Sequence, residues 1–268
     1  RIARNLGIAA DSPLRVRAGV QHVLNLLVGE GHVYAPAELL AERSAQVLKV
    51  DTETARDAIE AARLSGEIIV EFFESDDGLE EEAVYLPAFH YCEVNSAINL
   101  RNLINAPYNN QYVDSDKTLP WLEREMGITF APAQREAVAA AVNSKVMVIT
   151  GGPGTGKTTI IRAVLRMREE GGLRVMLAAP TGRAAKRMTE ATGHEAKTLH
   201  RLLEFSGGLE SGLFGSGTEY SGFMRNESNP LECDLLIVDE ASMIDQVLLH
   251  HLLRAVPPSA SLIFVGDV

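Results

Sequence analysis

Apolar residues recur at helical spacing along the first part of the chain. In LRVRAGVQHVLNLLV (14–28) they fall on one helical face, and a glycine follows as a stop signal. APAELLAERSAQVL (35–48) has a proline near its start, where a missing N–H costs a helix nothing. DTETARDAIEAARLSG (51–66) begins with Asp51 and Thr52 as N-cap candidates and ends on glycine. The pattern predicts three helices.

Two β-type runs come next, EIIVEFF (67–73) and EAVYLP (82–87), joined by a glycine-containing connection. Three helices followed by a hairpin is the element order of a winged helix-turn-helix. We therefore expect a small α+β, winged-helix-like domain over residues 1–105. Such modules bind DNA or serve as protein-contact or spacer domains. Residues 71–93 carry eight carboxylates and no Lys or Arg, which argues against DNA contact by the hairpin.

The second half of the chain alternates short apolar runs with helical segments. This alternation predicts an α/β domain over residues 125–268, with a parallel sheet and helices on both faces. A helix over 91–104 and a linker over 106–124 would join it to the first domain, and the glycine-rich stretch 206–222 is expected to be an exposed, flexible loop. The expected strands are Val146–Ile149, Val175–Ala179, Leu235–Val238 and Leu262–Val265.

Composition narrows the class of protein. Hydrophobic residues make up 46% and charged residues 23% of the 268 residues, as in ordinary globular proteins. No apolar stretch approaches the roughly 18 residues that span a bilayer. Two distant cysteines without CxxC spacing argue against a disulfide framework or a zinc site and favour a reducing cytoplasm. The chain starts without Met and stops within a pattern, so we expect a fragment.

The net charge of −11 is unusual for a protein that binds nucleic acid. The acidity is concentrated in residues 71–93, however, whereas residues 174–201 carry six Lys or Arg against two Glu. Charge alone leaves two alternatives open, a basic binding patch or two solvated surface segments.

The strongest chemical signal is GGPGTGKT (151–158), which fits the phosphate-loop pattern GxxxxGK[ST] between a predicted strand and a predicted helix. Glycines leave backbone N–H groups accessible and permit positive φ, and the helix directs its positive end at bound phosphates. Lys157 would reach the β- and γ-phosphates, and the Thr158 hydroxyl would bind Mg²⁺. The candidate nucleotide contacts are Gly151, Gly152, Pro153, Gly154, Thr155, Gly156, Lys157, Thr158 and Thr159.

A second signal is LLIVDEAS (235–242), an apolar run that ends in two carboxylates. Ligands of parallel sheets bind at the carboxyl ends of the strands, where Asp239 could hold Mg²⁺ and Glu240 could polarise a water. Helix N-capping is the alternative role for such a pair. The phosphate loop earlier in the chain favours the catalytic interpretation, and a general base beside a metal ligand indicates hydrolysis.

Three further stretches carry polar side chains that suit a nucleotide and a phosphodiester backbone. FAPAQREAV (130–138) places Gln134 on a helix before the phosphate loop, where its amide could read adenine or simply face solvent. AAPTGRAAKRM (178–188) follows a predicted strand, and TLHRLLE (198–204) adds a threonine, a histidine and an arginine, although the histidine could equally serve packing. The strand-binding candidates are Thr181, Arg183, Lys186, Thr198, His200 and Arg201.

Taken with TGGPGTGKTT, LLIVDEASM and LIFVGD, these motifs resemble superfamily 1 DNA helicases of the RecD/TraA type over roughly residues 125–268. The upstream EGHVYAPAELL and DDGLEEEAVYLP are also similar to the region before the motor in bacterial members. The resemblance implies a RecA-like P-loop NTPase domain and a cytoplasmic, ATP- and Mg²⁺-dependent motor that moves 5′→3′ on single-stranded DNA and separates strands at single-strand/duplex junctions, in repair or recombination. A membrane partner is not implied, and nuclease subunits or a single-strand-binding protein remain undecided.

By the same resemblance, Gln134 contacts adenine, Lys157 and Thr158 serve phosphate and Mg²⁺, and Asp239 and Glu240 serve metal and water. Asp267 begins the element that senses the γ-phosphate. The six strand-binding candidates hold the tracked DNA.

The chain also departs from that family. After VGD the family continues with a glutamine-containing sensor, a second RecA-like domain and a catalytic arginine, which these 268 residues lack. We therefore expect the chain alone to bind ATP·Mg²⁺ and DNA weakly, to hydrolyse ATP poorly and to unwind nothing. An ATP-gated DNA-binding or adaptor protein is the alternative. FSGGLE (205–210) faintly resembles the ABC-ATPase signature, but Leu209 replaces its glutamine.

Overall fold

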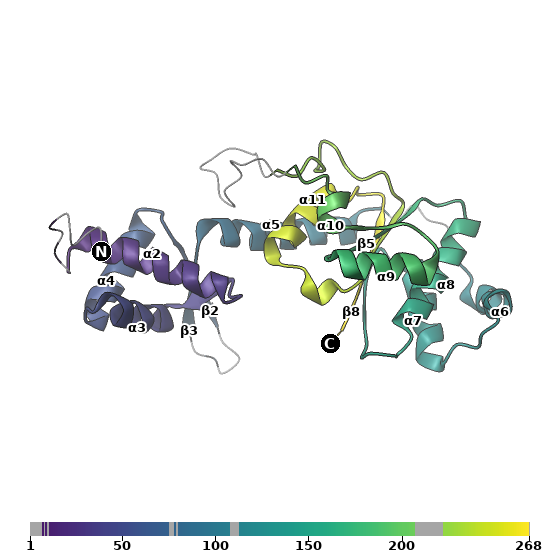
Figure 1. Cartoon of the computed structure of the whole chain (residues 1–268), viewed down its shortest axis with the longest axis horizontal. Coiled ribbons are helices and arrows are strands. Elements are labelled where there is room, and N and C mark those ends of the chain that lie inside the picture. Colours follow the sequence, from purple (N-terminus) through teal and green to yellow (C-terminus); the bar gives the residue numbers. More distant parts are fainter. Residues whose placement is uncertain are drawn as a thin grey trace. The chain divides into compact units, whose positions relative to one another are not determined.

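A computed structural model describes residues 7, 9, 11–74, 78, 80–107, 113–206 and 222–267. The chain divides into two compact units, residues 1–95 and 96–268 (Figure 1). The expected flexible loop at 206–222 lies almost entirely outside the described residues.

The first unit contains the predicted helices and hairpin. Its three strands form an antiparallel sheet in the order β1-β3-β2, and the three helices pack on it through a core that includes Leu24, Leu40 and Val84. Asp51 caps its helix as expected, since the Thr54 N–H donates to its carboxylate at 2.7 Å. The elements are α2 (Pro13–Gly29), β1 (Tyr34–Pro36), α3 (Ala37–Leu48), α4 (Thr52–Leu64), β2 (Ile69–Glu74) and β3 (Glu80–Tyr85).

The second unit has the predicted parallel sheet, now with five strands in the order β4-β8-β7-β5-β6. The four expected strands are confirmed, and the short β6 adds a fifth. The elements are α5 (Pro87–Asn105), α6 (Ser115–Met126), α7 (Pro132–Asn143), β4 (Val146–Thr150), α8 (Lys157–Glu170), β5 (Val175–Ala179), α9 (Gly182–Thr192), β6 (Ala196–Thr198), α10 (Leu199–Leu202), β7 (Leu235–Val238), the 3-10 helix η1 (Ala241–Met243), α11 (Gln246–Ala255) and β8 (Ser261–Gly266).

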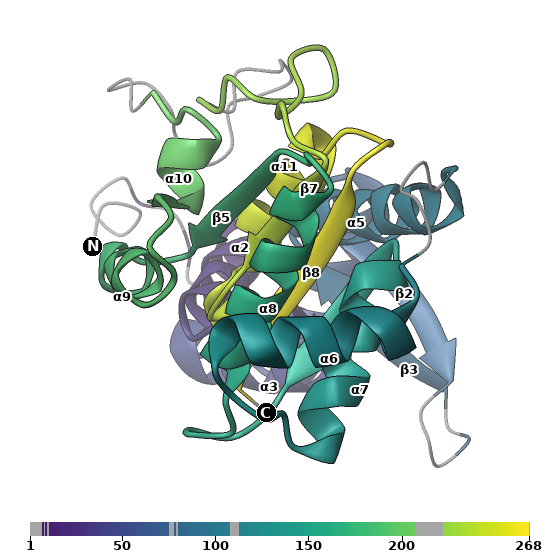
Figure 2. The same cartoon turned by 90° about the vertical axis from the view of Figure 1, so that its right-hand side faces the viewer.

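Helices cover both faces of this sheet, as predicted (Figure 2). Successive side chains of a strand point to opposite faces, which divides the apolar residues of β7 between two cores. Leu235 and Ile237 pack with α7 and α8, whereas Leu236 and Val238 pack with α10 and α11. A strand buried on both faces must be continuously apolar, which explains the run LLIV.

The boundary between the units differs from the expected one. The division falls after Asn95, inside α5, because Leu103 already packs in the core of the second unit. The expected linker 106–124 includes most of α6, whose Leu119 and Leu122 are buried in that unit. Residues 108–112 of the linker lie outside the described residues.

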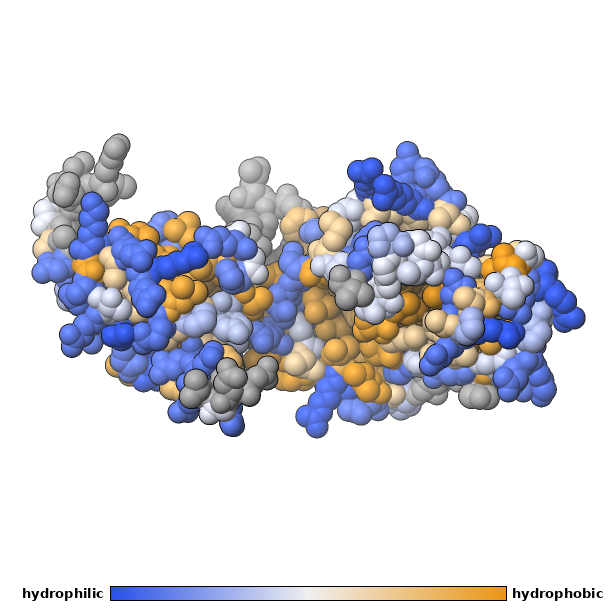
Figure 3. Space-filling view, turned by 90° about the horizontal axis from the view of Figure 1, so that it is seen from below, coloured by the Kyte–Doolittle hydropathy of each residue, from blue (hydrophilic) through white to orange (hydrophobic). Residues whose placement is uncertain are grey.

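Cys92 and Cys233 are both buried, and burial raises the pKa of the Cys233 thiol to about 12. Among the described residues, no helix has the length and apolarity needed to span a membrane. Each unit shows a mixture of hydrophilic and hydrophobic side chains on the face drawn in Figure 3.

Candidate functional site

The phosphate-loop motif forms the turn from β4 into α8. Gly154 and Gly156 have φ of +76° and +90°, a backbone conformation that favours glycine. A Cβ on Gly156 would lie 2.2 Å from the Gln134 amide nitrogen. A Cβ on Gly152 would instead meet nothing within 4 Å. The space beside this residue is open, and the absence of a side chain leaves its backbone accessible to a ligand. The loop therefore uses glycine for conformation at two positions and for access at another.

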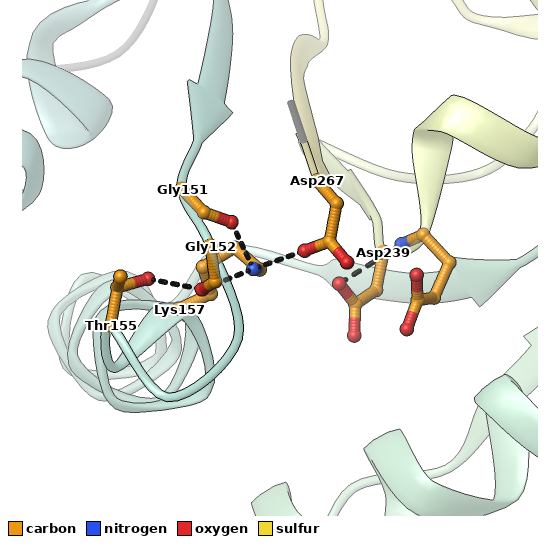
Figure 4. Close-up of polar contacts among 7 residues, drawn as sticks. Gly151, Gly152, Thr155, Lys157, Asp239 and Asp267 are labelled. Carbon is orange, nitrogen blue, oxygen red and sulfur yellow. Dashed lines mark hydrogen bonds and ion pairs between the residues drawn. The ribbon is translucent and has the colours of Figure 1, made fainter.

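Lys157 begins α8, and its ammonium group lies among oxygen atoms (Figure 4). It donates to the carbonyl oxygens of Gly151 at 2.5 Å and Gly152 at 3.1 Å, and it pairs with the Asp267 carboxylate at 2.5 Å. An ammonium has three N–H donors, so these acceptors use all of them. Thr158 and Thr159, which are also candidate nucleotide contacts, follow Lys157 in the first turn of α8.

Two aspartates, Asp239 and Asp267, lie at the carboxyl end of the parallel sheet. β7 ends at Val238, so Asp239 follows it directly, and Asp267 follows the neighbouring strand β8. Figure 4 shows Asp267 and Asp239 on the same side of Lys157, with Asp267 nearer to the ammonium group. The pKa of Asp239 is raised, chiefly because the carboxyl group is buried. The hydrogen bond from the Glu240 N–H and the charge of Lys157 lower this pKa, and the charge of Asp267 raises it. The carboxylates of Asp239 and Asp267 thus lie on the side of the sheet where the lysine would hold a phosphate, and one or two carboxylates together with phosphate oxygens suit Mg²⁺.

Glu240 has φ +54°, a left-handed conformation that is rare for a non-glycine residue. Its N–H donates to the Asp239 carboxylate at 3.0 Å. It stands at the N-cap position of η1, but its side chain makes no capping hydrogen bond. The capping interpretation of this residue therefore has no support in the geometry.

Gln134 contacts the phosphate loop directly. Its Nε2 donates to the Thr155 carbonyl at 3.0 Å, and its Oε1 accepts from the Ala131 N–H at 3.0 Å. A primary amide has two donors and two acceptor positions, so one donor and one acceptor remain. Sequence reasoning did not identify the contact with the loop, which joins residues 21 positions apart.

The strand-binding candidates lie at the ends of two neighbouring strands. Ala179 of β5 pairs with Thr198 of β6, so α9 and α10 begin side by side. Both helices are capped by a threonine that the sequence analysis had named only as a strand-binding candidate. Thr181 accepts from the Ala184 N–H and Thr198 from the Arg201 N–H, each at 3.2 Å. The cationic and imidazole side chains of the set, Arg183, Lys186, His200 and Arg201, are exposed.

Lys186 pairs loosely with Glu190 at 3.8 Å. Within the described part of the chain, Arg183 and Arg201 form no ion pair. The structure therefore brings the six strand-binding candidates onto two adjacent helix starts with positive charge available to solvent.

Sequence reasoning missed a row of rings next to this surface. The ring centroids of Phe205 and Phe223 are 4.8 Å apart, and those of Phe223 and His251 are 4.6 Å apart. His200 lies edge-on to Phe205 at 5.6 Å. These residues are scattered over 52 positions of sequence, so periodicity gave no signal for the row.

Two family models and several curated proteins match the sequence of this chain. A family model described as an AAA domain matches residues 134–268, and one described as the ATP-dependent RecD2 DNA helicase HHH domain matches residues 1–34. The ATP-dependent RecD2 DNA helicase of Deinococcus radiodurans is 35% identical over 266 residues, covering 97% of this chain and 35% of the relative. The RecBCD enzyme subunit RecD of Haemophilus influenzae is 37% identical over 158 residues, covering 50% of this chain and 23% of the relative.

A solved structure of two coordinating Pif1 helicases at forked double-stranded DNA aligns with a TM-score of 0.36 and 27% identity, over 52% of this chain and 34% of that one. The chain spans about a third of the length of the Deinococcus relative. An AAA-domain match over half of the chain, together with similarity to a RecD2 helicase over nearly all of it, shows that the chain belongs to the RecD-type superfamily 1 helicases.

Proposed function

We propose that this chain contains the first motor domain of an ATP-dependent DNA helicase and the smaller unit that precedes this domain in the sequence. The helicase moves 5′→3′ on single-stranded DNA and opens duplexes at junctions, in repair or recombination. Membership of its family implies nucleotide binding. The observation that carries the proposal is the meeting of the Lys157 ammonium, the open glycine turn and the Asp239 carboxylate at one end of the sheet.

Each residue has a defined part in this proposal. Lys157 binds the β- and γ-phosphates, and the remaining donor and acceptor of Gln134 match the N7 acceptor and N6 donor of adenine. Thr158 and Asp239 would hold Mg²⁺, which would neutralise phosphate charge. Glu240 orients and deprotonates the attacking water. Asp267, which directly follows β8, begins the element that senses the γ-phosphate in this proposal.

The exposed surface at the start of α9 and α10 holds the DNA backbone in this proposal. Phosphate contacts of this kind come from cations, hydroxyls and helix N-termini, and they give affinity without sequence preference. Thr181, Arg183, Lys186, Thr198, His200 and Arg201 supply them. The hairpin β2–β3, with its carboxylates, is assigned to protein contact or spacing instead.

The test uses ATP turnover by the product of the complete gene, with and without single-stranded DNA, alongside Lys157→Ala. We expect DNA to stimulate turnover, Lys157→Ala to abolish it, and unwinding to require a 5′ tail. The 268-residue chain alone should bind nucleotide weakly and unwind nothing, since an arginine supplied by a second domain is typically worth about 10³–10⁵ in turnover. Turnover that DNA leaves unchanged would favour the ATP-gated adaptor instead.

A further inference from the structure

We propose that the ring of Phe205 is a stacking surface for one base of the bound single strand, next to the backbone contacts of α9 and α10. The inference rests on the proposed function, because it assumes that single-stranded DNA crosses this surface. It adds a contact to the base, whereas the residues assigned above contact the backbone.

The ring is exposed and yet held in place. Phe205 is 42% exposed, and its N–H donates to the His200 carbonyl at 2.9 Å. A β-bridge pairs it with Phe223, whose ring lies 4.8 Å away at 48°. Behind Phe223, the His251 ring packs at 4.6 Å and is buried. Phe223 and His251 therefore support the Phe205 ring from the protein side, and its exposed part can contact a base.

The charges around Phe205 suit a polyanion. Arg201 lies one turn before it on α10 and forms no ion pair within the described residues. Glu204, the adjacent carboxylate, is paired with Arg225 at 2.8 Å. A nucleic-acid strand could thus place its phosphates along the start of α9 and α10 while a base reaches the ring.

A single exposed phenylalanine is common on protein surfaces and carries no meaning by itself. Phe72 provides the contrast within this chain. It is 60% exposed, but its cross-strand partner is Glu82 and its hairpin is acidic. What distinguishes Phe205 is a supported ring beside Arg201, which forms no ion pair within the described part of the chain. Such a combination of ring and cation binds single strands with little sequence preference.

The experiment measures binding of the 268-residue chain at low salt to two labelled oligonucleotides. One is oligo(dT) of about 12 nucleotides, and the other has the same backbone with abasic sites throughout. The variants are Phe205→Ala, Phe205→Leu, which keeps apolar packing against Phe223, and Phe205→Trp. Phe72→Ala is the matched control, and thermal melts verify that each variant is folded.

We expect Phe205→Ala and Phe205→Leu to weaken oligo(dT) binding by about 5- to 100-fold and to leave abasic DNA unaffected. Phe205→Trp should retain or improve binding, and Phe72→Ala should change neither oligonucleotide. The salt slope should stay the same for the Phe205 variants, because a stacked base releases no counterion, but should fall by about 0.7 for Arg201→Ala.

Equal losses on both oligonucleotides, or no loss with Phe205→Leu on oligo(dT), would overturn the stacking assignment and leave the helicase proposal intact. A wild-type chain that binds neither oligonucleotide would overturn both the assignment and the DNA-binding part of the proposed function.

Discussion

The Lys157 ammonium and the Asp267 carboxylate form an ion pair of 2.5 Å that joins the first turn of α8 to the end of β8. Lys157 is 18% exposed and Asp267 50%. The other two donors of the lysine bond carbonyl oxygens of its own loop. A phosphate that binds this lysine must therefore replace one of three acceptors, and the solvent-exposed carboxylate is the easiest to displace.

Asp267→Asn should strengthen binding of metal-free ADP by about 2- to 5-fold, because it removes a half-exposed competitor worth at most about 1 kcal/mol. Calorimetry without Mg²⁺ measures this change. Asp116→Asn removes an equal charge from the exposed surface of α6 and should have no effect. Weaker metal-free binding by Asp267→Asn would show that the carboxylate does not compete with phosphate.

Gln134→Ala should lower the affinity for ATP by about tenfold and the affinity for GTP by less. Loss of the bond to Thr155 loosens the loop for any nucleotide, whereas loss of the remaining donor and acceptor affects adenine alone. Comparative titrations with the two nucleotides separate these effects. An equal loss of affinity for ATP and GTP would show that Gln134 stabilises the phosphate loop and does not recognise adenine.

Asp239→Asn should abolish turnover and yet raise the melting temperature at pH 7 by a few degrees, since about 1 kcal/mol corresponds to roughly 2–4 °C in a domain of this size. Burial raises the pKa of Asp239, so its charged form is disfavoured in the folded protein. The destabilisation by the carboxylate is complete above this raised pKa and disappears as the pH falls through it. The gain in melting temperature should therefore shrink in acid.

Asp234→Asn is the matched control for this experiment, because Asp234 precedes β7 whereas Asp239 follows it. The Asp234 carboxylate accepts from the Arg174 N–H at 2.8 Å, and this hydrogen bond lowers its pKa. Its neutralisation should destabilise the fold. A melting temperature that falls for both variants would contradict the argument from burial.

The neighbouring histidines of α11 should make the second unit sensitive to acid. Burial lowers the pKa values of His250 and His251 to about 4. The unfolded chain takes up protons near pH 6.5, whereas the folded chain does so only near pH 4, so stability falls between these values. Each ring contributes at most about 1.4 kcal/mol per pH unit.

His251→Phe retains a ring against Phe223 and should make the urea midpoint less dependent on pH between 7 and 5. His22→Gln, which replaces an exposed histidine of the first unit, should not. Equal pH dependence in the wild type and His251→Phe would exclude this histidine as a source of the acid sensitivity.

Local patterns were sufficient to predict much of the fold. The helices of the first unit and the four strands of the parallel sheet have strong periodicity or continuous apolar runs, and the phosphate loop has its own signature. The three-residue strands β1 and β6 were missed because they are too short to show a pattern. β1 exists only through its pairing with Ala83–Tyr85, far along the chain.

The sequence motifs named candidate site residues one by one, but they gave no contacts between them. The sequence motifs identified Lys157, Asp267 and Gln134 separately, but the ion pair spans 110 positions and depends on β4 and β8 being neighbours. The rings behind Phe205 come together only after α10, the segment before β7 and α11 have packed. Such contacts depend on tertiary packing, which local sequence does not encode.

The strand that carries the phosphate loop, β4, is one of the two edge strands of the described sheet. β4 hydrogen-bonds to β8 on one side, and its Val148 is 63% exposed. Such a margin offers unpaired backbone donors and acceptors to any extended segment of matching length. A sixth strand that paired with this edge would support the phosphate loop from its open side. Strand addition at the edge and the affinity of the loop for a triphosphate would then be thermodynamically linked.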